Sequence, residues 1–179
     1  MKKYLIIGLL LFFPIISLSQ NPAIEKLFQK YNNTQGATLV DVTPDMFSLL
    51  TGNMNDSKEF NELMESIKSV KVLTIGNKES KGNADTKTLN EFKKDIEKNV
   101  NISEYTKLME VKEDGNHVQF LTKKSTKNPK NISEFLMIAL ENDGATLIYI
   151  LGDIEAKKLL KLSRSLGIKG FDEIERLRK

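Results

Sequence analysis

The chain contains no cysteine and no tryptophan among its 179 residues, and its only histidine is His117. Without cysteine it can form no disulfide, and it has no thiolate for metal binding or nucleophilic attack. One histidine alone cannot assemble an ordinary zinc or copper site. We therefore expect no metal, and stability has to come from a packed apolar core.

The glycines are too dispersed to form a nucleotide-binding loop. None of the ten lies in a G-x-G-x-x-G or Walker pattern, whose backbone amides cradle phosphates. No G-x-S-x-G segment is present to expose a catalytic serine. The sequence therefore predicts no cofactor, and it gives no support to a serine hydrolase.

The N-terminal segment has the order of a secretory signal peptide. Lys2 and Lys3 form a short positive start, an apolar stretch covers Leu5–Ile16, and the small residues Ser17 and Ser19 follow. The apolar stretch is about half as long as a membrane-spanning helix. We therefore expect signal peptidase to cut after Ser19.

The mature protein expected from this cut covers residues 20–179, with 1–19 as the signal peptide. Because no cysteine follows the cut, no lipid can be attached there, and we expect an exported protein, periplasmic or secreted, without a membrane anchor. The precursor has 27 basic and 24 acidic residues, and loss of Lys2 and Lys3 reduces this excess from three to one. A nearly neutral protein has no overall attraction for nucleic acid, so none is expected as a partner.

Helix and strand signals alternate in the first half of the mature chain. Asn21-Pro22 is a helix start signal, and apolar residues then recur at helical spacing. The expected elements are a helix with Ile24, Leu27, Phe28 and Tyr31 inward, a strand over Ala37–Val42, a short helix over Pro44–Leu50, a helix with the stripe Phe60, Leu63, Met64 and Ile67, a strand over Val70–Ile75, and a helix from Thr86 or Thr88 with Leu89, Phe92 and Ile96 inward.

From Tyr105 onward the apolar residues alternate, which is typical of strands. Asp114-Gly115 and Asp143-Gly144 suit the positive φ angles of tight hairpin turns. The expected elements are strands over Tyr105–Lys112, His117–Lys124, Ile132–Leu140 and Ala145–Leu151, followed by helices over Ile154–Leu166 and Asp172–Arg178.

The strands Ile132–Leu140 and Ala145–Leu151 are apolar on both faces, which predicts that they lie in the middle of the sheet. The whole pattern predicts a single α+β domain with a mainly antiparallel sheet, a C-terminal four-strand meander, and helices packed mostly on one face. Because the helices are few, we expect an apolar sheet face to remain for a protein partner or for self-association.

Three residues are the best candidates for catalysis, and each has a structural interpretation. His117 follows a hairpin turn, where an exposed strand histidine is favoured over a catalytic base. Asp41 and Asp45 flank a strand end, where α/β enzymes place acids, yet Asp45 also suits the first turn of a helix. We designate no catalytic residue and expect that the protein is not an enzyme.

Lys123, Lys124, Lys127 and Lys130 form the densest basic patch. No aromatic residue lies between them on which a base could stack. A solvated loop that keeps neighbouring strands from aggregating is therefore favoured over a nucleic-acid site.

Several segments together resemble a known family. They are the signal that ends in Ser-Leu-Ser-Gln, the helix IEKLFQKY, the segment GATLVDVTPDMFSLL, the strand SVKVLTI and the late meander. Over nearly the whole mature chain, these segments are similar to the exported proteins of Bacteroidota-type bacteria grouped as domain of unknown function 4252. The resemblance implies a Gram-negative envelope, and it brings no activity or catalytic residues to transfer.

These observations favour a non-enzymatic envelope protein that acts as an interaction or binding module. One alternative is a carboxylate-dependent hydrolase of an envelope polymer, with Asp41 and Asp45 as its acids. A regulatory partner of an envelope-stress system is a further alternative.

Overall fold

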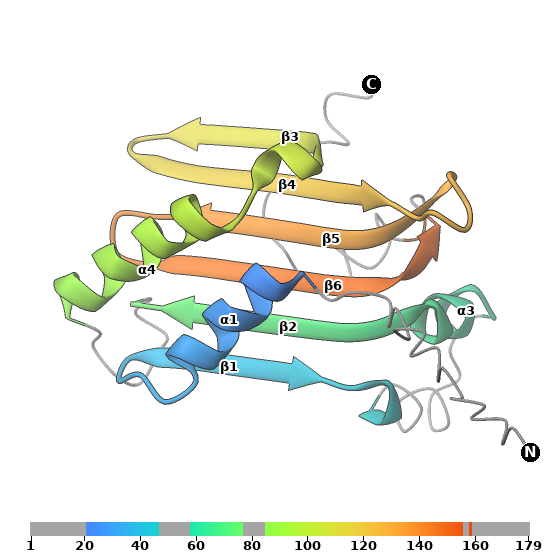
Figure 1. Cartoon of the computed structure of the whole chain (residues 1–179), viewed down its shortest axis with the longest axis horizontal. Helices are drawn as coiled ribbons and strands as arrows, with labels where there is room; N and C mark the ends of the chain where they lie inside the picture. Colours follow the sequence, from blue (N-terminus) through green and yellow to red (C-terminus); the bar gives the residue numbers. More distant parts are fainter. Residues whose placement is uncertain (1–20, 47–57, 77–84, 156–157, 159–179) are drawn as a thin grey trace, which may run out of the picture.

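The structure, a computed structural model, describes residues 21–46, 58–76, 85–155 and 158 (Figure 1). The expected signal peptide and the helix over Asp172–Arg178 lie outside these residues, as does most of the helices expected over Pro44–Leu50 and Ile154–Leu166. Among the described residues, no helix has the length and apolar character needed to cross a membrane.

Six antiparallel strands form one sheet in the order β1-β2-β6-β5-β4-β3. The last four strands in the sequence are consecutive neighbours, so the predicted meander is confirmed (Figure 1). The strands are β1 (Ala37–Val42), β2 (Ile67–Ile75), β3 (Thr106–Glu113), β4 (Asn116–Lys124), β5 (Asn131–Leu140) and β6 (Ala145–Glu155).

The two predicted hairpin turns differ in backbone conformation. Asp114 and Gly115 have φ angles of 47° and 82°, so the turn between β3 and β4 has the left-handed residues that its Asp-Gly pair predicts. Gly144 is not among the residues with positive φ, so the same expectation is wrong for the turn between β5 and β6. That turn is closed by the Glu141 amide, which donates to the Gly144 carbonyl over 2.8 Å.

Two of the described helices lie side by side on one face of the sheet (Figure 1). They are α1 (Pro22–Tyr31) and α4 (Thr86–Asn99), and each begins at a side-chain cap. Asn21 Oδ1 accepts from the Ala23 amide at 3.1 Å, and Asp85 Oδ1 accepts from the Thr88 amide at 2.6 Å. The expected packing of helices mostly on one face and the α+β class are therefore confirmed.

Apolar side chains alternate between the two faces of the sheet and form two clusters. The cluster beneath α1 and α4 includes Leu136 and Leu147, whereas Phe135 and Ile150 belong to the opposite cluster, to which α3 (Lys58–Ser66) adds Leu63 and Met64. A short 3-10 helix, Ile102–Glu104, precedes β3. The predicted mid-sheet position of β5 and β6 is confirmed, because both their faces are buried.

Two predicted boundaries near α3 and β6 are wrong for one physical reason. Ile67 begins β2 instead of ending α3, and β6 continues through Gly152 to Glu155, so Ile154 is a buried strand residue and not a helix start. A Cβ on Gly152 would lie 2.3 Å from the Ser66 carbonyl oxygen. Glycine is therefore required here for close approach of the end of α3, not for a turn.

Candidate functional site

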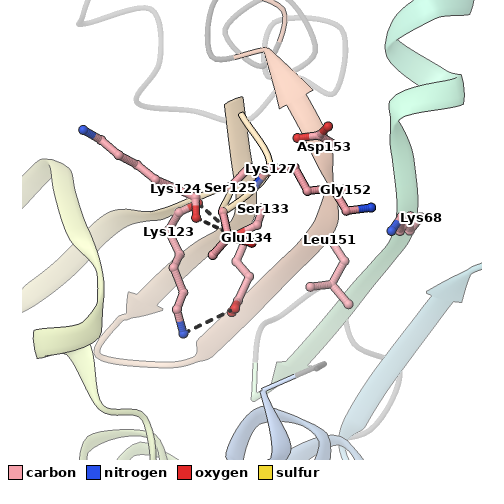
Figure 2. Close-up of a pocket in the computed structure, with 11 residues that line it drawn as sticks. Lys68, Lys123, Lys124, Ser125, Lys127, Ser133, Glu134, Leu151, Gly152 and Asp153 are labelled. Atoms are coloured by element: carbon pink, nitrogen blue, oxygen red, sulfur yellow. Dashed lines mark hydrogen bonds and ion pairs between the residues drawn. The ribbon is translucent and has the colours of Figure 1, made fainter. Parts of the chain in front are cut away.

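A pocket of about 310 Å³ opens at one end of the sheet, where β4 ends, β5 begins, and β2 and β6 pass alongside (Figure 2). Its lining comes from four separate segments of the chain. The lining residues are Lys68, Lys123, Lys124, Ser125, Thr126, Lys127, Ser133, Glu134, Leu151, Gly152 and Asp153.

Strand irregularities supply part of this lining. The register shifts between β2 and β6 around Lys68, between β4 and β5 at Lys123/Lys124, and between β5 and β6 around Ser133. Bulges of this kind change the direction of a side chain and increase the local twist. Ser133 Oγ donates to the carbonyls of Lys123 and Lys124 at 3.2 and 3.1 Å, which fixes two of the irregular segments together.

A buried carboxylate forms the inner end of the pocket. Glu134 is only 6% exposed, and its Oε2 accepts hydrogen bonds from the hydroxyls of Tyr105 at 2.7 Å and Tyr149 at 2.9 Å. Burial, together with the neighbouring Glu134 carboxylate, raises the pKa of both tyrosines above its ordinary value. Both hydroxyls therefore stay protonated and act as donors at neutral pH.

The same network reaches the start of α1. The Asn21 amide donates to the Tyr149 hydroxyl at 3.0 Å, and Asn21 Nδ2 donates to the Tyr105 hydroxyl at 3.1 Å. Each tyrosine thus accepts from Asn21 and donates to Glu134. This closed set of hydrogen bonds fixes the carboxylate against both the helix and the sheet.

The four lysines of the pocket are not equivalent. Lys123 Nζ lies 3.3 Å from Glu104 Oε2 and 3.6 Å from Glu134 Oε1, and it is 5.7 Å from the centre of the Tyr105 ring. No ion pair joins Lys68, Lys124 or Lys127 to a carboxylate in the part of the chain that the structure describes. Since the other charged lining residues are two acids, Glu134 and Asp153, the pocket has a net positive charge.

Ser125 adds a buried hydroxyl to the lining of the pocket. It is 7% exposed, and its Oγ accepts from the amides of Lys127 and Asn128 at 3.3 and 3.4 Å. Within the described ranges, its hydroxyl proton has no acceptor. The pocket lining therefore contains a hydroxyl donor as well as four lysines.

Asp41 and Asp45 lie outside this pocket and do not form a desolvated pair. Asp41 is 43% exposed in its side chain and lies 3.4 Å from Lys71 Nζ, which also donates to Glu25 at 2.8 Å. Although burial opposes protonation of Lys71, its bond to Glu25 outweighs that effect and its pKa is raised. Asp45 is exposed. The geometry at these residues gives no support to hydrolysis.

His117 is also outside the pocket, near the first hairpin turn. Its Nε2 lies 2.7 Å from Glu110 Oε1. Hydrogen bonds from Lys107 and His117 lower the pKa of Glu110 to about 2. The histidine thus belongs to an exposed charge cluster, and among the described residues no group of three or more His, Asp and Glu could hold a metal ion.

Sequence reasoning found part of the pocket and missed the rest. It singled out Lys123, Lys124 and Lys127 but interpreted them as a solvated loop, and Lys130 of the same patch does not line the pocket. It missed Lys68 and Glu134. One signal was available, because Glu134 is the only charged residue in the apolar strand Asn131–Leu140.

The expected apolar sheet face is not exposed at β5 and β6. Leu136 and Ile138 on one face and Phe135 and Met137 on the other are all buried. This removes the reason for which a partner was expected there. Large apolar side chains are exposed on the edge strands instead, with Val40 of β1 45% exposed and Leu108 of β3 50% exposed.

Comparison with known proteins identifies a family and no individual relative. No curated protein and no solved structure matches the chain. The family model described as "Domain of unknown function (DUF4252)" matches residues 31–162, which include every strand that the structure describes and the whole lining of the pocket. The match confirms the resemblance drawn from the sequence, and the chain belongs to the DUF4252 family.

Proposed function

We propose that the protein is an exported, non-enzymatic binding module of the cell envelope and that the lysine-lined pocket is its ligand site. The observation that carries the proposal is preorganisation. Strand irregularities supply part of the walls, and the hydrogen-bond network of Asn21, Tyr105 and Tyr149 fixes the lining residue Glu134. The backbone of the walls and this carboxylate are therefore in place before a ligand binds.

The polar groups of the pocket favour binding over catalysis. Ser133 donates to two carbonyls, and Glu134 already accepts from two tyrosines, so neither forms a pair of nucleophile and free base. Asp41 and Asp45, the acids of the hydrolase alternative, lie elsewhere. Export is supported by the signal pattern at residues 1–19.

Ligand binding is tested with ¹⁵N-labelled protein comprising residues 20–179 and a set of small anionic, neutral and cationic compounds. We expect at least one class to shift the amides of Ser125 and Glu134 saturably while the amide of Glu110 stays in place. The spectrum of the ligand itself should be unchanged after a day. Conversion of the ligand, or absence of any saturable shift at the pocket, would contradict the proposal.

Export is tested separately by expressing the full chain in a Gram-negative host and fractionating the cells. We expect the protein in the periplasm or the medium, beginning at Gln20 when its N-terminus is determined by mass spectrometry. A full-length chain retained in the cytoplasm would refute this part of the proposal and leave the binding test unaffected.

A further inference from the structure

We infer that the ligand presents an oxyanion, a phosphate or a carboxylate, to Lys68, Lys127 and the hydroxyl of Ser125, whereas the ammonium group of Lys124 points away from the other lining residues (Figure 2). This inference rests on the proposed function of the pocket as a ligand site, and it adds the chemical class of the ligand. It concerns the exposed lysines of the pocket, whereas Glu134 is buried and held by two tyrosines behind the lining.

The pocket has more basic than acidic residues in its lining. Four lysines line it together with two acids, Glu134 and Asp153. Lys123 already lies between Glu104 and Glu134, and the other three lysines have no carboxylate partner in the part of the chain that the structure describes. These three lysines are exposed, so solvent screens their repulsion from one another, but their combined charge attracts an anion to the pocket.

The hydroxyl of Ser125 is available as a hydrogen-bond donor to a ligand. Its Oγ accepts from two backbone amides, and the residue is buried on the pocket wall. A hydroxyl whose acceptor positions are occupied has its proton left to donate. Oxyanions accept several such bonds at once, and lysine ammonium groups with a hydroxyl donor are a usual set of phosphate and carboxylate partners.

The competing ligand chemistry is a cation held by Glu134 and Asp153. Glu134 Oε2 is occupied by two tyrosine hydroxyls, and Lys123 lies 3.6 Å from Oε1. A cation would therefore enter beside an ammonium group and against three further lysines. Asp153 Oδ1 is buried and has no hydrogen-bond partner among the described residues, so one acceptor remains for a cation. The oxyanion is favoured because the four lysines of the lining outnumber Asp153 and Glu134.

The direct test measures affinity by isothermal titration calorimetry at low ionic strength, with residues 20–179 of the protein. The probes are inorganic phosphate, acetate, ethylammonium and methyl glucoside. We expect phosphate or acetate to bind and the other two not to bind. Tighter phosphate binding identifies a phosphate-type ligand, and tighter acetate binding identifies a carboxylate-type ligand.

Two lysine variants locate the bound anion. The double variant Lys68→Gln/Lys127→Gln is expected to weaken anion binding by about tenfold, since two charge-assisted contacts are lost. The matched control is Lys130→Gln, which removes one charge from the loop of Lys127 but outside the pocket, and it should change affinity by less than about twofold. Equal losses in both would show that the anion is attracted by the surface in general, and would overturn the inference.

The variant Glu134→Gln distinguishes an anionic ligand from a cationic one, because the two affinities should change in opposite directions. Glutamine keeps an acceptor for the tyrosine hydroxyls and removes the negative charge, so anion affinity should rise, whereas affinity for a cation would fall. Asp153→Asn should act in the same direction and replaces Glu134→Gln if that variant does not fold.

Binding of ethylammonium or methyl glucoside alone at the pocket would refute the oxyanion and leave the proposed function standing. Failure of all ligands there would refute both.

Discussion

Two lysine clusters, one on the β3–β4 hairpin and one at the pocket, have their carboxylates arranged in different ways. On the hairpin, Lys107 and Lys112 of β3 lie 2.8 and 3.4 Å from Glu110, and His117 of β4 approaches the same carboxylate at 2.7 Å. At the pocket, the carboxylate of Glu134 already accepts from two tyrosines. Each lysine of the first cluster has a carboxylate partner, whereas Lys68, Lys124 and Lys127 of the second have none in the part of the chain that the structure describes.

This difference shows why a count of lysines does not locate a binding site. The Glu110 cluster is made by two adjacent strands, so its counter-charge lies on the same hairpin and the cluster is complete in itself. The pocket is made by four segments, and its carboxylate Glu134 accepts from Tyr105 and Tyr149 and lies near Lys123, but pairs with none of the other three lysines. Lysines without a carboxylate partner, in the lining of a pocket, favour binding of a ligand.

The largest expected effect is on stability, from removal of the buried carboxylate. Glu134→Ala leaves the hydroxyls of Tyr105 and Tyr149 without an acceptor, and each unsatisfied buried group costs about 1–3 kcal/mol. We expect the free energy of unfolding to fall by about 3 kcal/mol. Urea unfolding followed by circular dichroism measures it.

Glu110→Ala is the matched control for this comparison. It removes a carboxylate with several partners from the exposed cluster, where solvent replaces the lost contacts. Its unfolding midpoint should stay close to that of the parent protein. Equal destabilisation by both substitutions would show that the buried network is not the stronger of the two.

A smaller effect on the free energy of unfolding should distinguish Lys123, which has carboxylate partners, from Lys124, which has none among the described residues. Lys123→Met removes the cation beside Glu134 and Glu104, so it should lower the free energy of unfolding by up to about 1 kcal/mol. Lys124→Met removes no ion pair and should change it by less than about 0.5 kcal/mol. Thermal and urea unfolding compare the two variants, and the reverse order would contradict the assignment of partners.

The smallest effect is a pH dependence at the exposed cluster. The pKa of Glu110 is lowered from 4.5 to about 2 in the folded protein, so its ionisation stabilises the fold above pH 4.5. That contribution is lost as the pH falls from 4.5 toward 2. Between pH 5.5 and 2.5 the parent protein should therefore lose slightly more stability than Glu110→Gln. A Glu110 carboxyl that titrates near 4.5 by NMR would contradict this.

Local sequence signals were sufficient for most of the fold. The helix start at Asn21-Pro22, the alternation from Tyr105 onward and the Asp114-Gly115 turn all act over a few residues, and the elements they predict are present. The failure at Gly152 has a different origin. A glycine required by an approaching carbonyl has the same appearance in the sequence as a glycine at a turn.

The pocket was less predictable because it depends on the order of strands. Lys68 and Glu134 are 66 positions apart in the sequence and come together only because β6 lies between β2 and β5. Glu134 in an apolar strand indicated a buried charge, yet its partners Tyr105 and Tyr149 could not be identified from spacing. The register shifts that supply Lys68 and Ser133 leave no pattern in the residues themselves.

The lysines of the pocket should be available to a ligand, and those around Glu110 should not. A titration of the ¹⁵N-labelled protein with inorganic phosphate, followed by NMR, compares both clusters in a single sample. We expect saturable shifts of the amides of Ser125 and Lys127, with only weak, non-saturating shifts at Lys107 and Lys112. Equal, non-saturating shifts at both clusters would contradict this expectation.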